Sequence, residues 1–135
     1  QQAFSDPEIL LGAVESPAQR ALQPRLDAAV AAVVGYTDWV VDAVAVRVIG
    51  GDALRIAEAV RRQRSSSTPD DVFVERLLGI RVGEDQVMRG KALFQGVVDR
   101  VGETGITRIL DLPDSMPTAS ELEAPGLWIA RVSGE

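Results

Sequence analysis

Two aspartates, Asp38 and Asp42, lie four residues apart in the chain. If this segment is helical, the spacing places both carboxylates on one face, one turn apart. The flanking residues Tyr36, Trp39 and Val41 make their surroundings less polar than an ordinary acidic surface. Paired carboxylates in such surroundings can share a proton or hold a hard cation. Two ligands from one helix do not complete a metal site, so the alternative is a structural or solvated pair.

Four arginines that follow one another closely form the second group with chemical potential: Arg55, Arg61, Arg62 and Arg64. Guanidinium groups bind phosphates and carboxylates through two parallel hydrogen bonds, so these residues could hold an anion or contact a partner. On a helix, however, residues 61, 62 and 64 spread around the axis. The alternative is a solvated or salt-bridged face.

The remaining acidic clusters have a simpler explanation. Asp70, Asp71 and Glu75, and likewise Glu84 and Asp85, lie at predicted helix starts, where the helix dipole favours negative charge. A nucleotide site is not indicated either, because the segment 101–105 lacks the third glycine of a phosphate-binding loop and the strand that would precede it.

The composition excludes several classes of function. The chain of 135 residues contains no histidine and no cysteine, so it has no imidazole base, no Ser-His or Cys-His pair, no disulfide and no nitrogen or sulfur ligand for zinc. Its formal charge of -6 opposes binding to nucleic acid and to anionic membranes. We see no signal peptide and no apolar run of about 18 residues that could span a membrane. We therefore predict a cytoplasmic protein that binds neither nucleic acid nor membranes.

The elements that position these residues are predicted to be helical throughout. We expect an all-α fold of about six helices in a single domain, residues 1–135. A short helix follows Ser5, and the longest helix is expected after Pro24, from Arg25 to Val48. A strand over 40–48 is the alternative, because the segment is rich in valine. The predicted buried face of this helix consists of Leu26, Val30, Val33, Val34, Val40, Val41, Val44 and Val48.

Glycines and prolines divide the rest of the chain. Helices are predicted over about 52–64, 68–78, 83–101 and 103–110, followed by an irregular, proline-rich tail in which segment 127–129 docks on the core. Within helix 52–64 the arginines are expected on the solvent side. The residues expected to face inward in the helices over 52–64, 68–78 and 83–101 are Leu54, Ile56, Ala57, Val60, Val72, Val74, Leu77, Leu78, Val87, Met88, Leu93, Phe94, Val97 and Val98.

Four stretches of the sequence occur in an order seen in a known family. Residues 35–44, GYTDWVVDAV, resemble the segment EGHADYVMDAV of the zincin-like metallopeptidases found mainly in actinobacteria and often labelled as hydrolases associated with coenzyme F420 biosynthesis. Later parts of the same family are resembled by residues 61–62 followed by 75–80, by residues 86–90 running to 94–100, and by residues 112–121 ending at Pro125 and Trp128. The resemblance covers roughly residues 22 to 132, and its specificity comes from the four pieces in order.

The resemblance implies a zinc site whose ligands are largely missing here. In the family, a His-Glu-x-x-His helix and a later glutamate hold the metal. The first motif would lie upstream of Gln1, which implies that this chain is the C-terminal half of a longer protein. The glutamate aligns with Val34 and the family's histidine with Tyr36, whereas Asp38 matches an aspartate that orients a zinc-binding histidine. Val34, Tyr36 and Asp38 therefore read as the remnant of a metal site.

We interpret the chain as a non-catalytic, structural or partner-binding domain with a lost zinc site and no cofactor of its own. The alternative is the cleft-forming part of an active zinc-dependent hydrolase, with zinc held only if an upstream half supplies ligands. A third interpretation is an anion-binding domain that uses the arginine helix. The expected partner is its own N-terminal half or a second copy, in a dimer formed through the helix that carries Val30, Val33, Val34 and Val40.

Overall fold

The computed structural model describes residues 16–64, 75, 79–80, 82–111 and 113–134. The part of the chain it describes is helical and contains no strand, which confirms the all-α prediction. The helices predicted after Ser5 and over 68–78 lie outside these residues, apart from Glu75. The elements are α2 (Pro17–Ile49), η2 (Gly50–Asp52), α3 (Ala53–Arg64), α5 (Glu84–Val101), α6 (Thr104–Asp111), η3 (Pro113–Ser115), α7 (Ala119–Glu123) and α8 (Pro125–Ser133).

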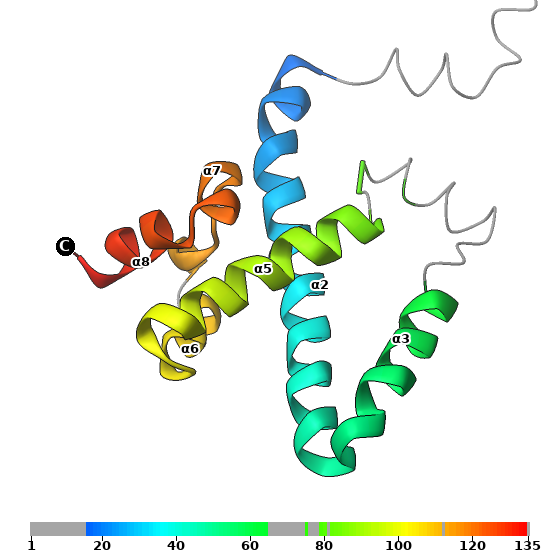
Figure 1. Ribbon diagram of the computed structural model, residues 1–135. Coiled ribbons are helices and arrows are strands. Elements are labelled where there is room, and N and C mark those ends of the chain that lie inside the picture. The colour runs from blue at the N-terminus through cyan, green and yellow to red at the C-terminus, as the bar shows by residue number, and fades with distance from the viewer. Residues whose placement is uncertain (1–15, 65–74, 76–78, 81, 112, 135) are drawn as a thin grey trace, which may run out of the picture.

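The long helix α2 is the axis on which the other elements assemble (Figure 1). At its C-terminal end η2 reverses the chain, and α3 returns beside α2 as the second arm of a hairpin. Helix α5 crosses α2 near its middle, and α6, α7 and α8 lie on the other side of α2 from α3. The crossing of α2 and α5 therefore joins the hairpin to the C-terminal helices.

The predicted start of α2 is wrong by eight residues, because Pro24 does not begin the helix. The helix starts at Pro17, where the Gln19 amide donates to Ser16 Oγ at 3.2 Å and the Ser16 amide donates back to Gln19 Oε1 at 2.7 Å. This reciprocal cap satisfies two N–H groups that a helix start otherwise leaves unpaired. Pro24 is exposed, so the carbonyl that lacks its usual partner faces water, and the helix continues through it.

The predicted buried face of α2 is also wrong. The fully buried residues of α2 are Ala28, Ala31, Ala32 and Gly35, whereas the larger side chains mostly face solvent, with Val48 77% exposed. The reason is the close approach of α5. A Cβ atom added to Gly90 of α5 would lie 1.8 Å from the Ala31 carbonyl oxygen. Only the smallest residues allow two helix backbones to come this close, so the valines are turned away from the crossing.

The hydrophobic core lies between α5 and the C-terminal helices. Leu93, Phe94 and Val97 of α5 are fully buried, as predicted, but Met88 lies on the other side of the helix and is 63% exposed. The buried residues that the later helices add to this core are Ile106, Ile109, Leu122 and Trp128. The predicted docking of segment 127–129 is thus confirmed through Trp128, whose indole N–H donates to the Ser115 carbonyl at 2.6 Å.

The C-terminal tail is largely helical rather than irregular, because two of its prolines begin elements and Pro117 lies between η3 and α7. Pro113 is the first residue of η3 and Pro125 the first of α8, positions where a missing N–H has no consequence. Thr118 caps α7 with Glu121, whose carboxylate also pairs with Arg131 at 2.6 Å. Because Glu121 is buried, these bonds fix α7 against α8.

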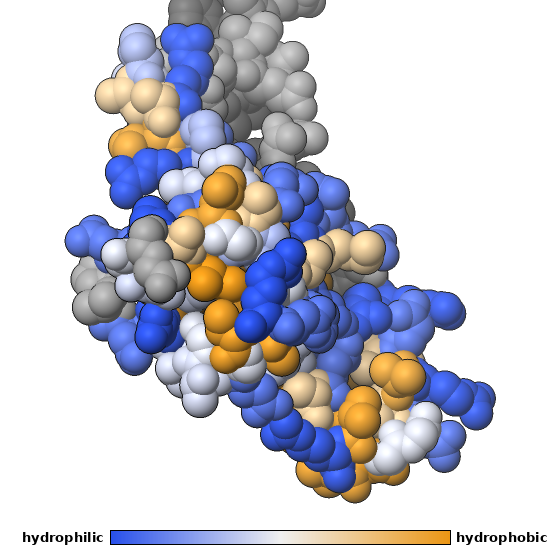
Figure 2. All heavy atoms as spheres, turned by 60° about the vertical axis from the view of Figure 1, so that its left-hand side comes forward, coloured by the Kyte–Doolittle hydropathy of each residue, from blue (hydrophilic) through white to orange (hydrophobic). Residues whose placement is uncertain are grey.

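The tip of the α2–α3 hairpin exposes apolar side chains, contrary to the predicted inward stripe of α3. Leu54, Ile56 and Val60 are exposed, and Ala53 is the residue of α3 that is fully buried. Figure 2 shows apolar side chains gathered at the lower end of the molecule, where the hairpin turns. We name the exposed residues Val44, Val46, Val48, Ile49, Leu54 and Ile56 the apolar tip.

The same region corrects the expectation that no segment is apolar enough to span a bilayer. The helical segment 17–63 contains an 18-residue window with a mean hydropathy of 1.6, which by length and composition alone is sufficient to cross a membrane. Only 17% of this window is buried within the chain. The same composition occurs in core helices of other proteins, so it does not identify a membrane span.

Candidate functional site

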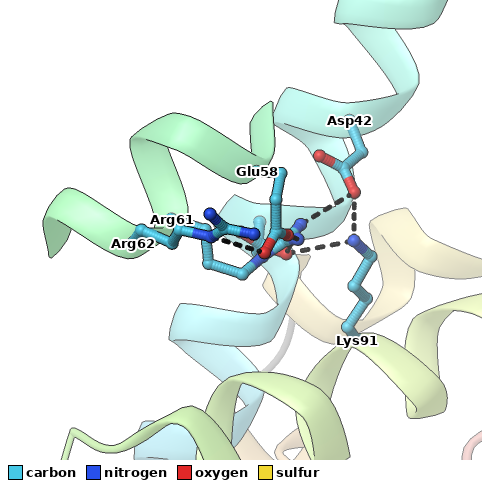
Figure 3. Close-up of polar contacts among 6 residues, drawn as sticks. Asp42, Glu58, Arg61, Arg62 and Lys91 are labelled. Carbon is cyan, nitrogen blue, oxygen red and sulfur yellow. Dashed lines mark hydrogen bonds and ion pairs between the residues drawn. The ribbon is translucent and has the colours of Figure 1, made fainter. Parts of the chain in front are cut away.

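A cluster of charged side chains lies where α2, α3 and α5 meet. Asp38 and Asp42 project from one face of α2, as their spacing predicted. The return of α3 brings Arg61 to this face, and the crossing of α5 brings Lys91, the residue after Gly90. Figure 3 shows Arg61 and Lys91 converging on Asp42. We call Asp38, Asp42, Glu58, Arg61 and Lys91 the charged cluster.

The cations approach the same oxygen of each aspartate. Arg61 Nη2 lies 3.2 Å from Asp38 Oδ2 and 3.2 Å from Asp42 Oδ2. Lys91 Nζ lies 3.1 Å from Asp38 Oδ2 and also donates to Asp42 Oδ2. The side chains of Asp38 and Asp42 are only 14% and 17% exposed, so these ion pairs are shielded from water. Each aspartate is therefore bridged by a cation from α3 and another from α5.

Glu58 joins the charged cluster to the surface of α3. Its two carboxylate oxygens accept from Arg61 at 2.7 Å and from Arg62 at 3.3 Å. Arg61 thus contacts the carboxylates of Asp38, Asp42 and Glu58, and the exposed Arg62 shares Glu58 with it. The cations of the charged cluster, Arg61 and Lys91, are thus paired with carboxylates of the same chain.

The ion pairs of the charged cluster shift the pKa of Asp38 and of Arg61. Burial raises the pKa of Asp38, but hydrogen bonds and positive charge from Lys91 and Arg61 outweigh it and bring the pKa below the ordinary value of 3.8. Burial likewise lowers the pKa of Arg61, and its bonds to Asp38, Asp42 and Glu58 raise it overall. Both residues are therefore charged at neutral pH, and Asp38 is a poor candidate for a proton donor.

Asp42 carries an unpaired oxygen. Its Oδ2 accepts from Arg61 and Lys91, but Oδ1 is buried and has no hydrogen-bond partner among the described residues. A buried acceptor without a partner is uncommon and lowers stability. Its position shows that the bridging cations reach one side of this carboxylate and leave the other unsatisfied.

The low pKa of Asp38 leads to a prediction about acid stability. Ionised Asp38 stabilises the folded chain above pH 3.8, and this contribution is lost as the pH falls through the lower pKa of the folded state. The groups that face it are Asp42, Glu58, Arg61 and Lys91. We expect the free energy of unfolding, measured by urea titration, to fall between about pH 5 and pH 2.

The Asp38→Asn variant should show a shallower dependence on pH than the parent chain. The comparison isolates Asp38 because Glu121, whose pKa is also lowered, mainly by its hydrogen bond from Arg131, contributes equally to both proteins. Equal slopes in the two proteins would show that Asp38 is not held in its ionised form by the cluster.

The structure brings together some of the predicted site residues and separates others. Asp38, Asp42 and Arg61 meet, although Arg61 was expected on the solvent side of its helix. Arg55 is exposed on α3, and the side chain of Arg64 lies outside the described part of the molecule. Two members of the cluster were not predicted: Glu58, which lies one turn before Arg61, and Lys91, which is the only lysine of the sequence.

Two of the acidic residues predicted at helix starts, Glu84 and Asp85, are found there. Glu84 and Asp85 lie in the first turn of α5, where their charge complements the helix dipole. Glu75 lies within the described residues, and its carbonyl accepts from the Ile80 amide at 2.9 Å. Asp70 and Asp71 are outside them.

The residues at the remnant positions do not fit the zinc site that the resemblance implies. Val34 is half-buried and has no atom that can bind a cation. Tyr36 packs its ring against Phe94, with ring centroids 5.3 Å apart. Asp38 has oxygens suited to a metal, but Arg61 and Lys91 already contact it. Within the described ranges, no three acidic side chains come close enough to hold a metal ion.

Comparison with known proteins shows the family to which the chain belongs. No characterised protein and no solved structure matches the chain. The family described as zincin-like metallopeptidase matches residues 1–129, which is nearly the whole sequence. This match agrees with the order of sequence stretches noted above, and it extends over the helices that carry the charged cluster. The chain belongs to the zincin-like metallopeptidase family.

Proposed function

We propose that this chain is a non-catalytic, metallopeptidase-related domain that provides a structural platform and binds a partner. The observation that carries the proposal is the pairing of Asp38 and Asp42 with Arg61 and Lys91. In a metal site these carboxylates would neutralise the charge of the ion. Here two side-chain cations neutralise them, so a metal ion would have to displace both.

Position 34 supports the same conclusion. The resemblance places a glutamate ligand there, and a valine cannot replace it. With neither histidine nor cysteine in the sequence, the side chains that this chain offers to zinc are carboxylates, and Asp38 and Asp42 lie close enough together to share the same cation. The charged cluster would therefore stabilise the α2–α3–α5 arrangement without a metal.

Metal content tests this proposal. The purified chain is incubated with a small excess of zinc, desalted and measured by elemental analysis, with a calorimetric titration in parallel. We expect far less than one zinc per chain and no saturable heat at micromolar zinc. Stoichiometric binding would instead favour the alternative of a zinc-dependent hydrolase to which this chain contributes ligands.

The partner-binding part of the proposal rests on the apolar tip. Large exposed apolar patches on proteins are usually contact surfaces, and both arms of the hairpin contribute to this one. We propose a second copy of the chain as its occupant, since most homo-oligomers pair identical surfaces around a two-fold axis. The contact surface differs from the one expected from sequence, because Val30, Val34 and Val40 are only partly exposed.

Solution mass tests the dimer. We expect light scattering at high protein concentration to give twice the chain mass, and Ile49→Glu, which adds charge to the tip, to give a monomer. Met88→Glu is the matched control, because Met88 is similarly exposed but lies on α5. A monomeric parent chain would contradict the proposal.

The absence of nucleic-acid and membrane partners and the cytoplasmic location remain predictions from composition.

A further inference from the structure

A small pocket lies between α6 and α8, away from the charged cluster. Its volume is about 210 Å³. Apolar side chains from the end of α5 and from α8 line one part of it: Val101, Trp128, Ile129 and Val132. Trp128 is itself fully buried, and its indole N–H donates to the Ser115 carbonyl, which fixes the position of this ring. Figure 1 shows α6 and α8 on the same side of α2.

The polar part of the pocket carries one charge, and that charge is positive. Thr104 and Arg108 of α6 and Ser133 of α8 supply it. Arg108 Nη1 donates to Ser133 Oγ at 3.1 Å, which holds the guanidinium at the pocket. Within the described residues no carboxylate pairs with Arg108, so its positive charge is not neutralised by an ion pair there. No acidic residue lines the pocket.

This arrangement is complementary to one kind of ligand. A guanidinium with free N–H groups binds a carboxylate through parallel hydrogen bonds, and the hydroxyls of Thr104 and Ser133 can donate to the same group. The apolar wall suits a hydrocarbon body. A cavity of about 150 Å³ is enough for a benzene ring, so this pocket has room for a ring and a carboxylate.

We infer that the pocket between α6 and α8 binds a small organic anion that carries one carboxylate on an apolar body, with Arg108 as the anion-binding residue. Inorganic phosphate has the charge but no apolar part, and a neutral amide has the apolar part but no charge. Comparing these three ligand types separates the contribution of each half of the pocket.

The experiment titrates the full chain with benzoate, benzamide and inorganic phosphate by calorimetry. We expect benzoate to bind with a Kd of about 1 mM, a value in keeping with a ligand of this size. Arg108→Gln should raise that Kd about tenfold or more, because it removes a charge-assisted interaction. Arg55→Gln is the matched control: it removes an equal charge from an exposed position on α3, so the Kd should not change.

Arg108→Lys separates the effect of the two parallel hydrogen bonds from the effect of the positive charge. An intermediate Kd is expected, because the charge remains but the parallel hydrogen bonds are lost. Circular dichroism verifies that each variant is folded. Several results would overturn the inference: benzamide binding as tightly as benzoate, phosphate binding as tightly as benzoate, no saturation by benzoate at about ten times the expected Kd, or an unchanged Kd in Arg108→Gln.

Discussion

Replacing Gly90 with alanine is expected to lower the free energy of unfolding by about 3 kcal/mol or more. The added methyl group would lie 1.8 Å from the Ala31 carbonyl oxygen and 2.9 Å from Gly35 Cα. Both are backbone atoms, so a change of rotamer cannot relieve the clash, and the two helices must separate. Chemical denaturation followed by circular dichroism gives the change in stability directly.

Gly126→Ala is the control for this variant. Gly126 lies in the first turn of α8, and a Cβ atom there meets nothing within 4 Å. Because alanine favours helix by about 1 kcal/mol over glycine, this variant should be as stable as the parent chain or slightly more so. Equal stability of Gly90→Ala and Gly126→Ala would show that α5 does not cross α2 in backbone contact.

Replacing Lys91 with methionine is expected to lower the free energy of unfolding by about 2–3 kcal/mol. Methionine keeps an unbranched apolar stem like that of lysine but leaves Asp38 and Asp42 close together with Arg61 as their shared cation. Both carboxylates are largely buried, so the repulsion between them is poorly screened. The estimate lies below the usual range for buried pairs because Lys91 is itself about one-third exposed.

Arg89→Met is the matched control, since Arg89 lies on the same helix and pairs with the exposed Glu123. An exposed pair contributes about 1 kcal/mol or less. The double variant Lys91→Met with Asp42→Asn should recover part of the stability that Lys91→Met loses, because it removes one of the two repelling charges. If Lys91→Met were as stable as Arg89→Met, Lys91 would not be the bridging cation of the cluster.

The fold class followed from the sequence because glycines, prolines and caps divide it into helical lengths. The apolar periodicity of α2 misled the prediction of its buried face, since periodicity does not tell which of two apolar faces meets a neighbour. Gly35 and Gly90 decided it by allowing the backbones to touch. That contact joins residues far apart in sequence, and Gly35 alone gave no sign of its partner. Pro24 misled the prediction of the start of α2 for a similar reason. The sequence alone does not tell that Pro24 is exposed, a position at which the helix continues through it.

The candidate site was only half visible in the sequence for a related reason. The spacing of Asp38 and Asp42 is local, so it was sufficient to place both on one face. Their cations come from α3 and α5, and each pairing depends on a helix crossing. One signal in the sequence could have indicated Lys91: it is the single lysine beside thirteen arginines. A lysine is a compact charge that fits between two carboxylates.

Crystals of the chain grown in the presence of zinc, with diffraction data collected at the zinc absorption edge, would show directly what neutralises Asp38 and Asp42. We predict no anomalous peak beside these carboxylates and ordered density for the side chains of Arg61 and Lys91 within hydrogen-bonding distance of them. An anomalous peak bonded to Asp38 and Asp42, with Lys91 displaced, would contradict the proposal that side-chain cations have taken the place of a metal.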